Sequence, residues 1–301
     1  MDFYYNKSTD LLPNVDPQNK LEKFVQFPLI RLFIILLMMA TVFLIFGVIN
    51  SGLRSAFDES IALYLTYLTT LLMIVATLLV YRVYTNSLEN REAWEISFNK
   101  IIPELSAGWL LGFGSVTFVV SILALMGYYR IGELQSFGNV VYMFFDQLKV
   151  GFIEELLFRV IIFKLTEEVF GSWVAIAFQG VLFGFAHSGN PNASIYSSLA
   201  LIFSFTIFFG AGYMITRRLW FIMGFHWSWN FFQAGIFGMQ NSGHIMPSLI
   251  DPNVQGPEWI TGGDWGLEMS VISMIVLFSI SLYFVKLAYA RNQFLKPMWR
   301  R

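Results

Sequence analysis

Long apolar stretches separated by short polar ones dominate this chain. A helix of about 20 apolar residues crosses the hydrocarbon core of a bilayer, so each stretch of that length indicates a membrane span. The pattern predicts an all-α fold, a polytopic membrane helix bundle of about eight transmembrane helices. The predicted spans cover residues 28–50, 60–84, 106–128, 137–163, 172–188, 194–216, 219–238 and 269–290.

Polar segments at the two ends suggest short tails around one membrane domain. We predict a polar N-terminal tail over 1–27, a single membrane domain over 28–290 and a basic C-terminal tail over 291–301. The polar stretch 85–101 reads as a connector between two spans. No repeat with a period of 20 to 50 residues interrupts this organisation.

Composition supports a membrane protein and excludes other classes. Hydrophobic residues make up 56% of the chain and charged residues 13%, whereas soluble domains carry about 25% charged residues. A net charge of −1 argues against nucleic-acid binding. Cysteine is absent, which excludes disulfides, thiolate nucleophiles and cysteine-based metal sites.

The distribution of basic residues predicts the orientation. Because the predicted number of spans is even, both termini lie on one side, and only Arg54 and Arg130 fall in segments on the other side. The side rich in Lys and Arg is cytosolic. We therefore expect cytosolic N- and C-termini, an external loop over 239–268, and, from the compact chain, a bacterial inner membrane. The basic residues on the terminal side are Lys7, Lys20, Lys23, Arg31, Arg82, Arg91, Lys100, Lys164, Arg217, Arg218, Lys286, Arg291, Lys296, Arg300 and Arg301.

Two adjacent glutamates inside the fourth span are the most unusual feature. Charged groups at membrane depth are costly and mark functional sites. Glu155 and Arg159 are four residues apart and share a helical face, so they can form an ion pair. Glu154 points about 100° away and has no such partner, which suits a general base facing a cavity. The same residues also fit a salt-bridge cluster that only packs helices, with Asp146 and Lys149 as a further pair.

Three more polar side chains lie within or at the edge of apolar spans. His187 ends the fifth span, one turn after Phe183, while His226 and Asn230 are four residues apart in the seventh. An imidazole and an amide facing a carboxylate can steady a water molecule or an oxyanion. The alternative is an interfacial aromatic belt with incidental polar groups. We expect a polar cavity among helices 4, 5 and 7.

This cavity requires one segment to bend. Glu154 and His187 lie about equally far from the turn near residue 170, roughly 25 Å of helix each. His226 lies only ~10–12 Å into its span, so straight helices would keep it from His187. We predict that residues 188–193 are non-helical and line the cavity.

Other intramembrane protease designs fit poorly. No His-Glu-x-x-His sequence is present, which removes the usual zinc-protease pattern. Asp146 is the one aspartate in a predicted span, so an aspartyl dyad is missing. Ser188 directly follows His187, and Ser228 lies two residues after His226; both spacings turn the paired side chains apart.

The motifs resemble those of the CAAX-protease and bacteriocin-processing (CPBP, or Abi) intramembrane endopeptidases, which include the Ras-converting prenyl-protein proteases. Glu154, Glu155 and Arg159 match Glu-Glu-x-x-x-Arg, and Phe183 with His187 matches Phe-x-x-x-His. The third motif, His-x-x-x-Asn, is matched by His226 and Asn230. The resemblance covers about 137–238, which would be the catalytic core.

The resemblance implies proteolysis of a membrane-associated, lipidated or bacteriocin-like peptide in the bilayer, with Glu154 activating water. His187, His226 and Asn230 would be catalytic, with Glu155, Arg159 and Phe183 in support. We expect no cofactor; the alternative is a zinc ion held by His187, His226 and Glu154. Two other functions stay open: a transporter or channel with a buried proton relay, and a non-catalytic peptide-binding immunity protein.

Overall fold

The computed structural model describes residues 6–301, in two compact units. One unit is Thr9–Ser97, and the other comprises Phe98–Arg301 with Met1–Ser8. The single membrane domain over 28–290 stays a prediction. The first five residues of the predicted tail 1–27 lie outside the described residues.

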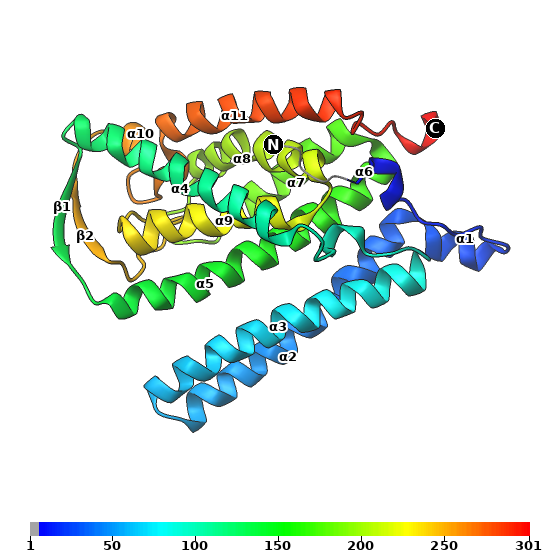
Figure 1. Cartoon of the computed structure of the whole chain (residues 1–301), viewed down its shortest axis with the longest axis horizontal. Helices are drawn as coiled ribbons and strands as arrows, with labels where there is room; N and C mark the ends of the chain where they lie inside the picture. Colours follow the sequence, from blue (N-terminus) through cyan, green and yellow to red (C-terminus); the bar gives the residue numbers. More distant parts are fainter. Residues whose placement is uncertain (1–5) are drawn as a thin grey trace. The chain divides into compact units, whose positions relative to one another are not determined.

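The unit Thr9–Ser97 is a hairpin of two long helices, α2 and α3 (Figure 1). Pro28 occupies the first turn of α2, where a missing N–H costs nothing. The Asp58 carboxylate caps α3 by accepting the Ile61 N–H at 3.1 Å. Helices here are α1 (Lys20–Gln26), α2 (Pro28–Ala56) and α3 (Glu59–Leu88), with 3-10 turns η1 (Ser8–Leu11, crossing the unit boundary) and η2 (Trp94–Ile96).

Buried ion pairs occupy the end of this hairpin, within the stretch predicted as a polar connector. The guanidinium of Arg31 meets Glu89 at 2.5 Å, and Arg91 meets Glu95 at 2.6 Å. Arg31 and Arg91 were used above to predict the orientation in the membrane. In the structure they also form buried ion pairs. Helix α3 runs to Leu88, so the connector begins later than predicted.

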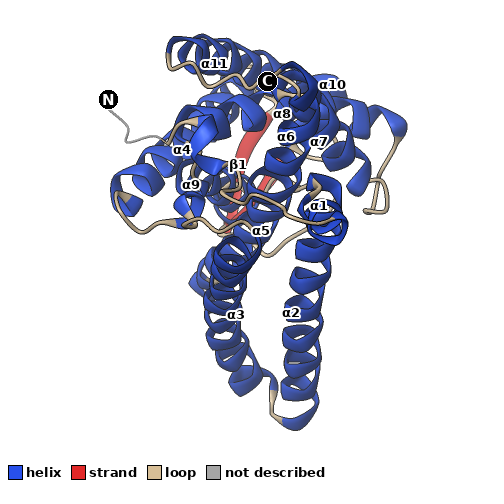
Figure 2. Ribbon diagram, turned by 90° about the vertical axis from the view of Figure 1, so that its right-hand side faces the viewer, coloured by secondary structure: helices blue, strands red, loops and turns tan. Residues whose placement is uncertain are grey.

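The larger unit is also helical, as Figure 2 shows by its colouring. Its helices are α4 (Ile101–Leu125), α5 (Phe137–Glu155), α6 (Lys164–Phe170), α7 (Ser172–Ala186), α8 (Ile195–Thr216), α9 (Leu219–Asn230), α10 (Glu258–Thr261) and α11 (Val271–Ala290). Two π-helical segments, η3 (Leu156–Phe163) and η4 (Phe231–Ile236), continue α5 and α9, and short 3-10 turns cover Leu267–Met269 (η5) and Met298–Arg300 (η6).

Among residues 6–301, five helices are long and apolar enough to cross a membrane. They are α2, α3, α4, α8 and α11. The other predicted spans are also helical. Segments α5, η3 and α6 follow one another without a break, and α9 continues into η4. Helix α7 is a shorter apolar helix of 15 residues. The chain is thus an integral membrane protein of helical type.

A small sheet departs from the predicted all-α fold. Strand β1 (Tyr129–Leu134) pairs antiparallel with β2 (Ile250–Val254), from Tyr129 opposite Val254 to Leu134 opposite Ile250. Figure 1 shows the two strands side by side where α4 connects to α5. The partners are more than a hundred residues apart in sequence, so neither short strand was evident from its own pattern. The pair fastens the loop 239–268 to the segment before α5.

Buried ion pairs fix the start of α9. Arg218 donates from Nε to Glu104 of α4 at 2.8 Å. Arg217 donates from Nη2 to Glu167 of α6 at 2.9 Å, and it also bonds Gln293 of the C-terminal tail. Both arginine side chains are fully buried. Gln293 of the tail 291–301 is therefore packed against the bundle.

Helices α4 and α9 approach closely because small residues face each other. A Cβ added to Gly108 would lie 1.9 Å from the backbone oxygen of Phe221, which is impossible without movement of α9. Small residues commonly permit such contacts between membrane helices. Gly114, on the same helix, has open space around the equivalent position.

Replacing Gly108 with Ala should therefore destabilise the protein by about 1–3 kcal/mol, as overpacking does. The matched variant Gly114→Ala should leave thermal stability unchanged or slightly raised, because Ala favours helix over Gly. Thermal unfolding of both purified variants in one detergent checks this. Equal melting temperatures for the two variants would contradict the close packing of α4 on α9.

Candidate active site

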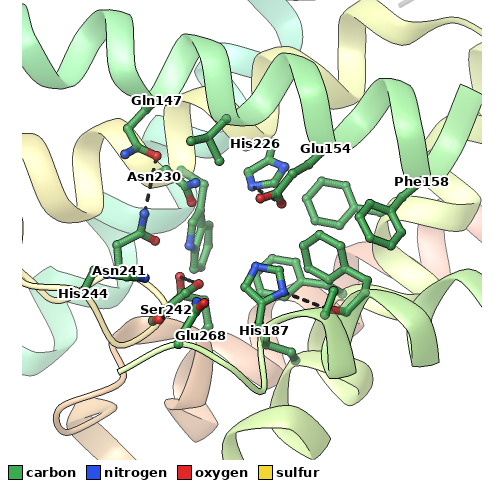
Figure 3. A pocket seen from close by; sticks show the side chains of 18 of the residues that line it. Gln147, Glu154, Phe158, His187, His226, Asn230, Asn241, Ser242, His244 and Glu268 are labelled. Atoms are coloured by element: carbon green, nitrogen blue, oxygen red, sulfur yellow. Dashed lines mark hydrogen bonds and ion pairs between the residues drawn. The ribbon is translucent and has the colours of Figure 1, made fainter. Parts of the chain in front are cut away.

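All three sequence motifs contribute to one cavity of about 390 Å³ in the larger unit. Glu154 lines it from the end of α5, His187 from the end of α7, and His226 and Asn230 from α9. Figure 3 shows Glu154 and His226 together on one side, with His187 across from them. The four residues predicted to be catalytic thus share one enclosed space.

Helix lengths explain why these residues meet. The turn predicted near 170 lies at Gly171, whose φ of 82° is in the left-handed region that glycine adopts readily. Helix α7 has only 15 residues, or about 22 Å of rise, so His187 ends at the level of the cavity. Residues 188–193, predicted to be non-helical, lie in the turn between α7 and α8.

Glu155 binds Arg159 as predicted, and it has a second partner that the sequence did not indicate. Its Oε1 accepts from the Arg159 guanidinium at 3.0 Å and from His226 Nδ1 at 2.7 Å. The side chains of Glu155 and Arg159 are both fully buried. Glu155 therefore sets the orientation of His226 as well as neutralising Arg159.

This contact defines the tautomer of His226. A carboxylate can only accept, so Nδ1 carries the proton, and Nε2 is the other ring nitrogen. Nε2 lies 3.8 Å from Glu154 Oε2, beyond direct hydrogen-bond distance. In such an arrangement, a carboxylate bound to one ring nitrogen orients the imidazole, and the other ring nitrogen faces the reacting groups.

His187 is oriented by its own helix. Its Nδ1–H donates to the Phe183 carbonyl oxygen at 2.8 Å, which again assigns the proton to Nδ1. The His187 and Phe183 rings lie 4.7 Å apart, centroid to centroid. Both histidines of the site therefore have Nε2 free to accept a hydrogen bond in the neutral form.

Phe183 has a further role beside Arg159. The Arg159 guanidinium carbon lies 4.6 Å from the centroid of the Phe183 ring and 4.1 Å from that of Phe209. Cations over aromatic faces are attracted by the ring quadrupole. Two Arg159 nitrogens, Nε and Nη2, have no hydrogen-bond partner, so these ring contacts replace part of the lost hydration.

Glu154 differs from Glu155 in its exposure and in having no Lys or Arg within ion-pair distance, although both glutamates have an Oε2 without a hydrogen-bond partner. The side chain of Glu154 is 25% exposed, whereas that of Glu155 is inaccessible. Its Oε2 has no hydrogen-bond partner. A carboxylate that faces a cavity with one unengaged oxygen is available to a water molecule or a substrate group.

Several cavity residues were missed from the sequence. Asp146, which also lines the cavity, forms the predicted pair with Lys149 at 2.7 Å. His244, assigned above to a polar loop, lines the cavity too. The other polar residues of the lining that were missed are Gln147, Asn241, Ser242 and Glu268, whereas Asn190 belongs to the segment 188–193 predicted to line the cavity. Most come from the loop 239–268 and its surroundings, and nothing in their local sequence sets them apart from ordinary loop residues.

Glu268 is the most informative of these residues. It is 2% exposed and accepts hydrogen bonds from Gln233 Nε2 at 3.0 Å and Ser242 Oγ at 3.3 Å. It lies just before α11, and burial raises its pKa to about 7. The sequence did contain a signal for Glu268. It is an acidic residue directly before an apolar span, and no basic residue lies nearby in sequence.

A metal site does not emerge from these side chains. Within residues 6–301, no group of three or more His, Cys, Asp or Glu side chains has the arrangement to hold a metal ion. His187, His226 and Glu154, the alternative zinc ligands, line one cavity, but they do not form such a group.

Comparison with known proteins agrees with the motifs. Residues 136–232 match the family model described as type II CAAX prenyl endopeptidase Rce1-like. This segment is similar to that protease family. The matched segment contains Glu154, His187, His226 and Asn230. No curated protein and no solved structure gives a significant match.

The two adjacent glutamates should respond differently to loss of charge. Glu155→Gln removes the charge that neutralises Arg159, and breaking a buried pair costs about 3–5 kcal/mol. Glu154 is partly exposed and has no Lys or Arg partner. The free energy of unfolding of the Glu154→Gln variant should therefore stay within ~0.5 kcal/mol of that of the unmodified protein.

Thermal unfolding of the two variants in one detergent measures this difference directly. The two positions are adjacent and the substitutions identical, so each variant is the control for the other. Similar melting temperatures for both variants would contradict the division of roles between Glu154 and Glu155.

Proposed function

We propose that this chain is an intramembrane endopeptidase in which Glu154 activates a water molecule to hydrolyse a peptide bond. The observation that supports it is the common cavity of Glu154, His187, His226 and Asn230, reached from three separate helices. A carboxylate, two oriented imidazoles and an amide are the groups that amide hydrolysis requires.

Glu154 is the general base in this proposal. A water molecule between its carboxylate and His187 Nε2 would donate one hydrogen bond to each. Glu154 takes the proton as the water oxygen attacks the scissile carbonyl carbon. The same carboxyl group then returns that proton to the leaving amine nitrogen when the carbon–nitrogen bond breaks. Glu154 is ionised again after the products depart, so the proton balance closes.

His226 and Asn230 stabilise the oxyanion in the same step. The Asn230 amide donates directly. His226 donates from Nε2 as an imidazolium, a form that the Glu155 carboxylate at 2.7 Å from Nδ1 stabilises. Such preorganised donors are worth about 10²–10³ in rate for each group.

The proposed substrate is a membrane-associated peptide, either lipidated or bacteriocin-like. The family description supports a peptide near its attachment to a lipid. Apolar side chains form much of the cavity wall, among them Phe158, Leu201 and Phe205. We further propose that eight helices cross the bilayer, with both termini in the cytosol of a bacterial cell. A proton-relay transporter or an inactive peptide-binding protein would have the same cavity without turnover.

The sharpest test of catalysis is Glu154→Gln in an assay on a library of membrane peptides. Loss of the base should reduce kcat by at least ~10²–10⁴ while the protein stays folded. Glu133→Gln, an exposed glutamate of β1, is the matched control and should retain full activity. Cleavage that survives in purified Glu154→Gln would overturn the assignment, and no turnover by the unmodified protein would favour the non-catalytic alternatives.

The proposed mechanism uses no metal. We expect activity to persist in strong chelators, and active protein to contain no stoichiometric zinc by elemental analysis. Hydrogen bonds would then replace Lewis acidity at the oxyanion. Stoichiometric zinc, with activity lost on chelation and restored by zinc, would move the assignment to a site of His187, His226 and Glu154.

A further inference from the structure

The wall of the cavity contributed by α9 and the loop 239–268 contains two buried groups that the proposed reaction does not use. One is the Glu268 carboxylate. The other is the indole of Trp229, which is 1% exposed and whose Nε1–H has no hydrogen-bond partner. Figure 3 shows Glu268 and Ser242 across the cavity from Gln147 and Glu154.

Glu268 has donors around it but no countercharge. Its neighbours are the neutral side chains of Gln233 and Ser242 and the Ser242 backbone N–H. Among residues 6–301, no Lys, Arg or His forms an ion pair with it. Every other nearly inaccessible glutamate named above, such as Glu155, Glu104 and Glu167, meets an arginine. A buried carboxylate without a cation is costly unless it takes up a proton or a ligand supplies the charge.

The rest of the cavity is acidic as well. Its lining includes Glu154 and Asp146 but no Lys or Arg, and Asp146 is already neutralised by Lys149. The loop 239–268, which supplies part of the wall, contains no Lys or Arg and four acidic residues: Asp251, Glu258, Asp264 and Glu268. A carboxylate of a substrate would be repelled here, whereas an ammonium or guanidinium group would be attracted.

We propose that Glu268 and Trp229 form a specificity subsite that binds a Lys or Arg residue of the substrate. The basic side chain places its charge against the Glu268 carboxylate, and Trp229 Nε1–H donates to a carbonyl oxygen of the bound peptide. Burial raises the pKa of Glu268, which agrees with a carboxyl group that has no cationic side chain beside it. This inference rests on the proposed proteolysis for its biological meaning, but peptide binding tests it separately.

The first experiment varies the substrate and leaves the protein unchanged. A peptide that the enzyme cleaves is prepared with Lys, norleucine or Glu at each position flanking the scissile bond. At one position, Lys should raise kcat/KM by about 10-fold or more over norleucine, which has a similar apolar stem without the charge, and Glu should lower it. The absence of any position with a Lys preference overturns the subsite.

The second experiment removes the carboxylate. Glu268→Gln should abolish the preference for Lys while norleucine peptides are cleaved within ~3-fold of the original rate. Glu258→Gln, an exposed glutamate of the same loop, should keep the preference. A Lys preference that survives in folded Glu268→Gln also overturns the proposal.

Binding separates this proposal from the proposed protease activity. In the Glu154→Gln protein, which should bind without cleaving, the Lys peptide should bind about 10-fold more tightly than the norleucine peptide. Tight Lys binding without turnover in the unmodified protein would support the subsite and reject the protease. Cleavage with equal binding of both peptides would do the reverse.

Discussion

The Glu155 carboxylate is the interaction on which the site depends. It is buried in a helical bundle where an unpaired charge is costly, and it accepts from both Arg159 and His226. Arg159 in turn lies over Phe183 and Phe209. One carboxylate thus connects α5, η3 and α9, and through the phenylalanine contacts also α7 and α8. Any helix movement that displaces His226 breaks its hydrogen bond to Glu155, whereas the Glu155–Arg159 pair, four residues apart on one helical segment, is retained.

A second group of buried charges holds α9 at its other end. Arg217 and Arg218 precede α9 and pair with Glu167 and Glu104 on two different helices. Glycine contacts between α4 and α9 leave no room for sliding. His226 and Asn230 are therefore carried by a helix that is fixed at its start and along one face. Such rigid support matters because catalytic groups lose their effect when displaced by about 1 Å.

The cavity joins groups of two different origins. The motif residues lie in or at the ends of helices, whereas Glu268 and Ser242 lie in the loop 239–268. The β1–β2 pair ties this loop to the segment before α5. In our proposals the helices perform the hydrolysis and the loop selects the substrate. Variation in the loop would then change specificity without altering the groups that act on water, as is common for functional loops on rigid scaffolds.

The sequence alone determined the helical class, the approximate bounds of the helices, the Glu155–Arg159 pair and the candidates Glu154, His187, His226 and Asn230. These follow from local properties: hydropathy over 20 residues, spacing by one helical turn, and the cost of charge in apolar surroundings. Tertiary structure alone decided the rest. The bond from Glu155 to His226 joins residues 71 positions apart. The β1–β2 pair joins residues more than a hundred positions apart, and Glu268 reaches the cavity only through tertiary packing. Such contacts depend on which helices become neighbours. The hydropathy pattern of one helix does not specify which other helix will pack against it.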